Sequence, residues 1–444
     1  MPESQNIEYK SSWRDDYLKW ICGFANANGG RIFIGTDDSG NVIGIPNAQK
    51  LMEDIPNKVK DTMGILVDVN LNHFSTKDYL EIVVESYPSP VNYKGQYHYR
   101  SGSTKQELKG AALDKFMLNK KGKRWDGVPV PYVSVSDLKS ETFDFFRTRA
   151  LKSHRIEETA LNDSNEQLIE NLQLKENDYL KRAAILLFHP NPEKFVTGAY
   201  IKIGRFKTDD DLRFQDEIHG NLFEQIEKTM DLLTTKYMKF EISYEGLARI
   251  ETPEYPVEAI REALLNAVSH KDYSGGVPIQ IKVYDDKIIF WNEGQLPENW
   301  TVDTLLQQHP SKPFNPDISN AFFRCGYIES WGRGITKIKN ECKNSGLPKP
   351  IYHFNEPDFS VEFRTESCYK NDLIKSGINE RQFKAILFAK DNGLIRNMDY
   401  QSLNNVSKRT ATTELTALVQ KYNILIKQGT SGSGIIYYFN EEMY

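Results

Sequence analysis

The most regular pattern of apolar and polar positions in the chain lies between Val257 and Ser269. Apolar residues recur there at the three- and four-residue spacing of one helix face, namely at Ala259, Ala263, Leu264 and Ala267. Glu262 and Asn266 are four residues apart, so both side chains leave the same side of the predicted helix. A carboxylate that accepts a proton from water and an amide oxygen that binds a hard cation are groups that nucleotide hydrolysis needs. The alternative is that Glu262 only belongs to the polar face of an amphipathic helix.

Two strand patterns and two glycine-containing segments follow this helix. Residues 279–283 and 287–291 flank Asp285-Asp286, which predicts a hairpin. The second strand leads into residues 292–294, where a glycine lets the backbone approach a ligand. Residues 332–334 open a further predicted helix, and free amides at such a glycine-rich start can point at phosphate oxygens.

The order of these elements resembles the GHKL ATPase superfamily, which includes gyrase, the heat-shock chaperone and sensor histidine kinases. It looks more like the divergent branch found in bacterial proteins described as transcriptional regulators. The resemblance runs from about Tyr255 to Phe363 and implies an α/β sandwich that uses ATP and Mg²⁺. It implies that Glu262 is the general base toward water and that Asn266 holds Mg²⁺. The other residues that it implies in nucleotide binding are Asn292, Gly294, Lys312, Gly332, Arg333 and Gly334.

One position departs from the superfamily pattern. Asn292 stands where an aspartate usually accepts the adenine amino group, and a neutral amide is a weaker acceptor than a carboxylate. The resemblance therefore implies nucleotide binding more strongly than it implies hydrolysis, and any ATPase activity is expected to be weak.

The first 118 residues alternate helix and strand signals, with a helix predicted at 15–26 and strands at 30–35 and 80–85. Five segments resemble the Schlafen AlbA-type domain: ESQNIEYK (3–10), FANANGG (24–30), IGTDD (34–38), YPSPV (87–91) and YHYRSGST (97–104). The resemblance covers about the first quarter of the chain and implies an α/β domain that binds nucleic acid.

Some animal members of that family cleave RNA with two glutamates and an aspartate. By resemblance these map onto Glu3, Glu8 and Asp37, or Asp38 if the register is shifted by one residue. They form a second candidate metal site whose hard oxygen ligands suit Mg²⁺ or Mn²⁺. The alternative is that Glu8 pairs with Lys10 across a strand and that Asp37-Asp38 makes a turn. The candidate phosphate contacts of this domain are Arg31, Lys94, Arg100 and Lys105.

The last segment predicts three helices, at 380–390, 398–404 and 407–421, and two strands around the glycine-serine tip at 429–434. This order resembles a winged helix-turn-helix, which often places its third helix in a DNA groove. Lys408 and Arg409 begin that helix and are the candidate contacts. The alternative is a winged helix used for dimerisation or protein contact, because several acidic residues dilute the positive field.

The predicted fold class is α/β (α+β) in several domains: 1–124 AlbA-type, 125–254 connecting, 255–366 GHKL-like and 371–444 winged helix. The connecting region holds a strand or helix at 182–188, a strand at 199–203 and a helix at 220–236, and it is expected to pack on the ATPase core. The basic linker at 120–124 is either a solvated spacer or a phosphate-contacting arm.

The amino-acid composition narrows the possible class of protein further. The chain has 444 residues, 39% hydrophobic and 12% aromatic, which is typical of folded domains. A net charge of −5 excludes a uniformly basic nucleic-acid coat but leaves local basic surfaces open. The four cysteines form no CxxC pair, which favours a reducing cytoplasm. Neither a signal peptide nor a bilayer-spanning run is visible.

These patterns predict a cytoplasmic ATP-binding and nucleic-acid-binding protein, a transcriptional regulator switched by nucleotide. A lid near Lys312 to Phe323 is expected to order on nucleotide. The alternative function is a Schlafen-like, metal-dependent nuclease gated by ATP. The expected partner is nucleic acid, DNA in preference to RNA, without a membrane, and self-association into a homo-oligomer is left open.

Overall fold

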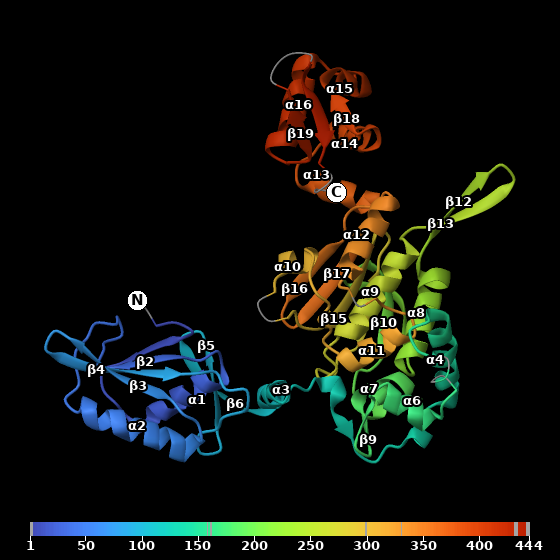
Figure 1. Cartoon of the computed structure of the whole chain (residues 1–444). Helices are drawn as coiled ribbons and strands as arrows, with labels where there is room; N and C mark the ends of the chain where they lie inside the picture. The colour runs from blue at the N-terminus through green and yellow to red at the C-terminus, as the bar shows by residue number, and fades with distance from the viewer. Residues whose placement is uncertain are drawn as a thin grey trace. The chain divides into compact units, whose positions relative to one another are not determined.

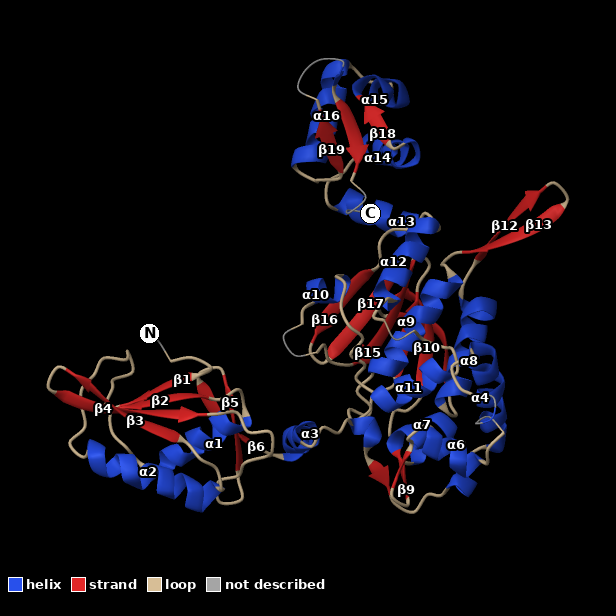
Figure 2. Cartoon of the chain, in the orientation of Figure 1, coloured by secondary structure: helices blue, strands red, loops and turns tan. Residues whose placement is uncertain are grey.

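A computed structural model describes residues 3–157, 159, 162–297, 300–329, 331–429 and 434–440 (Figures 1 and 2). The chain is a mixed α/β protein with several sheets, as predicted from the sequence. It divides into two compact units, Met1–Trp125 and Asp126–Tyr444.

The first unit is built on a four-stranded sheet of order β1-β2-β4-β3, in which β1 and β2 are parallel and the other neighbours antiparallel. Two helices pack on this sheet, and a hairpin and a third helix follow it (Figure 2). The bounds are β1 Ile7–Lys10, α1 Leu18–Asn26, β2 Gly30–Ile34, α2 Ala48–Met63, β3 Asp68–Phe74, β4 Lys77–Val84, β5 Tyr97–Ser101, β6 Thr104–Leu108 and α3 Gly110–Lys120.

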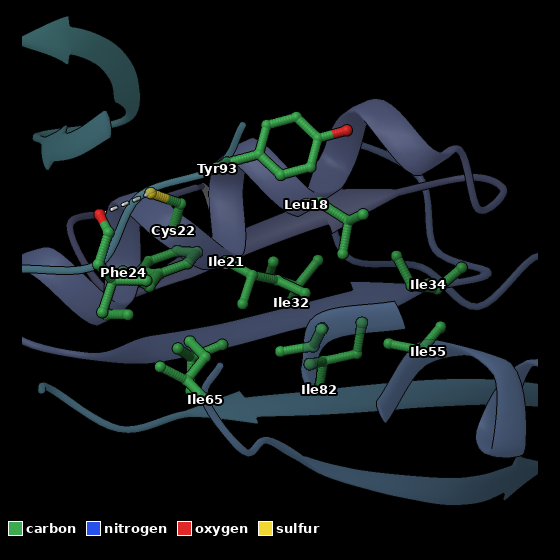
Figure 3. Packing of buried hydrophobic residues seen from close by; sticks show 14 of the residues in the cluster. Leu18, Ile21, Cys22, Phe24, Ile32, Ile34, Ile55, Ile65, Ile82 and Tyr93 are labelled. Carbon is green, nitrogen blue, oxygen red and sulfur yellow. Dashed lines mark hydrogen bonds between the residues drawn. The ribbon is translucent and has the colours of Figure 1, made fainter. Parts of the chain in front are cut away.

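The core of this unit lies between the sheet and α1 and α2. Alternate residues of β4 are buried, as expected for a strand with one covered face. They meet apolar residues of β2 and of the helices, and Ile21, Ile32, Ile34, Ile55 and Ile82 are fully buried there (Figure 3).

The second unit is built on a six-stranded sheet of order β11-β10-β14-β15-β17-β16. Only the β10–β14 pair is parallel. The bounds are β10 Ile201–Thr208, β11 Asp211–Ile218, β14 Ile279–Val283, β15 Lys287–Glu293, β16 Ile351–Asn355 and β17 Asp358–Arg364. The predicted connecting region supplies β10 and β11, two strands of this sheet, and its helices α7 and α8 contact α11 and α9.

Helix α9 is the central helix of this unit: it packs on the sheet and contacts α8, α11 and α12 (Figure 1). Its apolar residues other than Val257 are buried, including the four predicted to form one face. The helices of this part are α4 Ser140–Ser153, α6 Asn165–Asn171, α7 Arg182–Phe188, α8 Leu222–Leu232, α9 Val257–His270, α10 Val302–Leu306, α11 Pro316–Arg324 and α12 Gly334–Asn344. Residues 182–188, predicted as a strand or a helix, are therefore a helix.

The described residues between 366 and 440 form a connecting helix, α13 Glu366–Lys375, followed by three helices and a three-stranded antiparallel sheet. The sheet order is β18-β20-β19, and a separate apolar core lies beneath it. The bounds are α14 Glu380–Asn392, β18 Leu394–Arg396, α15 Asn397–Asn404, α16 Lys408–Gln420, β19 Leu425–Gln428 and β20 Ile436–Phe439. Most of the predicted tip at 429–434 lies outside the described residues.

A two-stranded hairpin, β12 Phe240–Glu245 and β13 Ala248–Pro253, projects from the second unit (Figures 1 and 2). The sequence patterns did not predict it. Within the described ranges, no helix is long and apolar enough to cross a bilayer.

Candidate nucleotide site and nucleic-acid surfaces

Glu262 and Asn266 lie one turn apart on α9, facing the start of α12. A Cβ atom placed on Gly334, the first residue of α12, would lie 2.4 Å from Glu262 Oε1 and 3.2 Å from Asn266 Nδ2. A side chain at this position would require the Glu262 carboxylate, the far end of a flexible side chain, to move aside. The structure thus brings together the helix motif and the second glycine segment, which are about seventy residues apart in sequence.

Neither of these two polar side chains forms a hydrogen bond or an ion pair with another residue of the described ranges. Burial raises the pKa of the Glu262 carboxyl, and the positive charges of Lys337 and Arg261 oppose that shift. A raised pKa brings a carboxylate closer to neutral pH, where it is a better general base. A carboxylate and an amide without protein partners beside a glycine-rich helix start fit the phosphate and Mg²⁺ end of a nucleotide.

The segment predicted to contact adenine adjoins the other end of α9. The backbone N–H of Asp272, just beyond the helix, donates to the carbonyl of Glu293 at 2.8 Å. Asn292 is buried, and its Nδ2 donates to the Glu293 carbonyl at 2.9 Å. A Cβ on Gly294 would lie 2.8 Å from Asn292 Nδ2 and 3.1 Å from the carbonyl of His270. The side-chain nitrogen of Asn292 is therefore occupied by a hydrogen bond within the protein. The implied adenine contact needs only the side-chain oxygen.

The predicted lid is shorter than the sequence suggested. Residues 316–324 form α11, whose Ile318 and Phe322 are fully buried, so this part is a core helix and does not belong to a lid. The segment before it is more open: Lys312 is exposed, with its Nζ 5.4 Å from the ring of Trp300.

This segment contacts the second glycine segment. Gly332 has a φ of +67°, and a Cβ there would lie 2.2 Å from the His309 carbonyl, so both the conformation and the contact require glycine. Arg333 is exposed and precedes the first turn of α12.

Two buried polar residues at the end of α9 were missed in the sequence. Asn315 is fully buried, and its Nδ2 donates to the carbonyls of Ser269 at 3.1 Å and Lys271 at 2.8 Å, which fixes the lid segment to the helix end. The Asn-Pro pair before a helix was the available signal. Lys271 is also buried, which lowers its pKa to about 8, and nothing in the local sequence indicated this.

In the first unit, Arg100 is an internal residue. It is completely buried, and its guanidinium donates to Glu8 Oε2 at 2.6 Å and to the carbonyls of Ser4 at 2.6 Å and Ile7 at 3.1 Å. The guanidinium carbon also lies 4.8 Å from the centre of the Trp20 ring. The expectation that Arg100 contacts phosphate is therefore corrected: its charge is neutralised in the core by a buried carboxylate.

Of the three carboxylates proposed as a second metal site, Glu3 and Glu8 share the Lys10 ammonium and Asp37 belongs to a turn. Glu8 is buried and pairs with Lys10 as well as Arg100, and Glu3 lies 3.4 Å from Lys10 Nζ. Asp37 closes a turn by accepting from the backbone N–H groups of Ser39 and Asn41, and a hydrogen bond from the Asn41 side chain is the main cause of its lowered pKa. In the described part of the chain, no three His, Cys, Asp or Glu side chains group to hold a metal ion.

The remaining candidate cations lie at or near the surface. Arg31 is exposed and pairs with Glu81 at 2.8 Å, Lys94 is exposed, and Lys105 on β6 is half-buried. Lys408 and Arg409 are exposed in the first turn of α16 and form no ion pair with any described residue.

Two family models match the chain. Residues 3–109 match the model described as "Schlafen, AlbA_2", and residues 276–363 match the model described as "Putative ATP-dependent DNA helicase recG C-terminal" (HATPase_c_4). The chain combines a Schlafen AlbA_2 domain with an ATPase-like domain. Such domains point to a nucleic-acid-associated protein of the ATPase type. The second match contains Asn292, Gly294, Lys312 and residues 332–334. It begins after α9 and so does not include Glu262 and Asn266, whose place in the candidate site is supported by their geometry alone.

No curated protein matches the chain. Among solved structures, the crystal structure of the DIP2311 protein from Corynebacterium diphtheriae is similar, with 16% identity and a TM-score of 0.47. The alignment covers 98% of this chain and 92% of that one.

We expect Gly332→Ala to destabilise the second unit, because the added methyl group would overlap the backbone carbonyl of His309 at a residue with a φ of +67°. Overpacking of this kind costs roughly 1–3 kcal/mol. Urea unfolding of the full chain, followed by circular dichroism, measures the change. Thr336→Ala, exposed on α12, is the control and should stay within about 0.5 kcal/mol of the wild type. Equal stability of the two variants would contradict the close approach of Gly332 to His309.

We expect Arg100→Met to destabilise the first unit by roughly 3–5 kcal/mol, because it leaves the Glu8 carboxylate buried without its arginine. Arg31→Met removes an exposed pair of the same chemistry and should cost at most about 1 kcal/mol. Tryptophan fluorescence during urea unfolding compares the two variants, since Trp13 and Trp20 lie in this unit. An unchanged midpoint for Arg100→Met would show that the buried pair does not hold the unit together.

Proposed function

We propose that this chain is an ATP-binding, nucleic-acid-binding regulator of transcription in which nucleotide controls DNA contact. The single observation that carries the proposal is the packing of the Gly334 backbone on Glu262 and Asn266. The groups expected to meet the phosphates lie directly against the groups expected to hold the cation and the water. The AlbA_2 and ATPase-like domains support the same assignment.

Each residue of the site has a role in this proposal. Asn266 would hold Mg²⁺ through its amide oxygen, and the half-buried Glu262 would take a proton from the attacking water. The amides at the start of α12 would bind phosphate oxygens once the segment moves off α9. Bound Mg²⁺ supplies positive charge that stabilises the charge on the transferred phosphoryl group.

Helix α12 offers a physical route from this site to the C-terminal domain. Its first residue lies on α9, and just past its other end the carbonyl of Gly346 accepts a hydrogen bond from Lys390 Nζ of α14 at 2.8 Å. An 11-residue helix is about 16 Å long at 1.5 Å per residue and moves as a rigid rod. Nucleotide that displaces the start of α12 would therefore disturb the contact with α14.

The C-terminal domain is proposed to be a winged helix that contacts DNA. The order α14-β18-α15-α16-β19-β20 is the order of that motif, and α16 takes the place of its recognition helix. Lys408 and Arg409 in the first turn of α16 support contact with DNA over contact with protein, because they are exposed cations without ion-pair partners among the described residues. DNA is favoured over RNA because a helix of this kind fits the major groove of B-DNA, whereas that of A-form RNA is too narrow.

We expect Asn266→Ala to abolish Mg²⁺-dependent ATP binding and Glu262→Gln to keep binding while losing turnover. The first change removes the metal ligand, and the second removes only the base, which is worth roughly 10²–10⁴-fold in rate. Titration calorimetry and phosphate release measure the two effects. Asn57→Ala, exposed on α2 of the first unit, is the control. Absence of ATP affinity in the wild-type chain would overturn the nucleotide proposal.

We expect Lys408→Ala with Arg409→Ala to weaken DNA binding and to reduce the slope of log K against log salt by roughly 0.9 for each phosphate that the protein no longer neutralises. The control is Lys375→Ala with Lys384→Ala, which removes the same charge from exposed sites on α13 and α14. Fluorescence anisotropy with duplex DNA and with RNA, each with and without ATP and Mg²⁺, measures affinity. Equal weakening in both double variants would mean that only net charge matters, and an affinity independent of ATP would refute the switch.

A further inference from the structure

The β12–β13 hairpin pairs with no other strand of the described ranges. It forms a two-stranded sheet of its own, whereas the neighbouring strands β10, β11 and β14 belong to the six-stranded sheet. Its base is anchored: Lys239 Nζ lies 3.3 Å from Asp285 Oδ1, the Glu254 N–H donates to the Lys239 carbonyl at 2.9 Å, and Tyr255 is buried. The arm beyond this base projects away from the sheet and its helices (Figure 1).

The arm carries apolar side chains into solvent. Its large apolar residues have exposed fractions of 54% for Ile242, 70% for Tyr244, 104% for Leu247 and 36% for Ile250. A two-stranded hairpin is at best marginally stable in water, and a flat edge of unpaired backbone groups invites another strand. Both features indicate that the arm pairs with something outside this chain.

The charges of β13 indicate that the partner is a second copy. Arg249 and Glu251 flank Ile250, both are exposed, and within one copy they form an ion pair with each other at 2.6 Å. If two β13 strands pair antiparallel about a two-fold axis at Ile250, each Arg249 faces the Glu251 of the other copy, and the two isoleucines meet. Opposite charges placed directly across such a ladder are stabilising. Strand β12 carries only acidic charges, so its pairing with itself brings no opposite charges together.

The backbone register agrees with this arrangement. Glu245 faces Ala248 across a two-residue turn, and such turns close on a hydrogen-bonded pair. Hydrogen-bonded and non-bonded pairs alternate along the ladder, so the N–H and C=O groups of Arg249 and Glu251 point away from β12. They are the groups that a second β13 strand would bond.

We infer that the β12–β13 hairpin is a dimerisation arm, which joins two copies of this chain through antiparallel β13 strands into one four-stranded sheet. A contact confined to two hairpins falls below the roughly 1,200 Å² of a standard stable interface, so the dimer is weak and dissociates on dilution. This inference is independent of the nucleotide proposal, because it uses none of the residues of that site.

Sedimentation velocity over a roughly hundredfold concentration range tests the arm in variants that reverse the charge of Arg249 or Glu251. Wild type should show a monomer–dimer equilibrium. Arg249→Glu places Glu against Glu, and Glu251→Arg places Arg against Arg, so each variant alone should dimerise roughly tenfold or more weakly. An equimolar mixture of the two should dimerise again, because each contact then joins Glu to Arg. The chain with both changes should also recover.

Arg213→Glu is the matched control, since Arg213 forms the same kind of exposed pair, with Asp211 at 3.0 Å, on the edge strand β11. It should leave the dimer unchanged. Circular dichroism checks that every variant is folded. Wild type that stays monomeric at all concentrations overturns the inference, and so does a dimer that persists in both single variants or fails to return in their mixture.

Discussion

The candidate nucleotide site of the second unit depends on one close contact between two helices. At Gly334 the backbone of α12 comes so near to α9 that a methyl group there would displace the Glu262 carboxylate. This approach places glycine amides, a carboxylate and an amide side chain within one small volume. Under the proposed function, nucleotide phosphates and the α9 side chains would compete for the same backbone at the start of α12. Ligand binding would then be coupled to movement of that helix.

The first unit treats its buried charges differently, because they pair with each other inside the core. Its most buried charges, Glu8 and Arg100, are partners, and two carbonyl groups of the N-terminal segment accept hydrogen bonds from Arg100 Nη2. A carboxylate that is committed to an arginine in the core is a poor ligand for a metal ion, because releasing it would leave a buried unpaired charge. Other cations of the AlbA_2 domain, such as Arg31 and Lys94, stay exposed at its surface.

The features that the sequence predicted are local ones. The α9 helix follows from its apolar spacing, and the turn at Asp37 follows from its own side chain and the residues directly after it. The features that it did not predict depend on distant partners. Nothing near Arg100 shows that Glu8, ninety-two residues away, will bury it. The strand β10 gave no sign that it would pair with β14 across the intervening helices. The alternating apolar and polar residues of β12 were a strand signal, but nothing nearby in the sequence shows that the hairpin at 240–253 stands apart from the six-stranded sheet.

The net charge of the chain gives a reason why dimerisation through the β12–β13 arm would help the proposed binding of nucleic acid. A chain with a charge of −5 repels DNA at long range, and the two exposed cations of the first turn of α16 are a small attraction for one domain. A dimer carries two such helices, and once one has bound, the second meets the same duplex at a high effective concentration. Avidity of this kind multiplies weak contacts without requiring a strong basic patch. Because the proposed dimer is weak, a small change in chain concentration would alter how many copies bind DNA in pairs. A change in the position of α12 would have a similar effect.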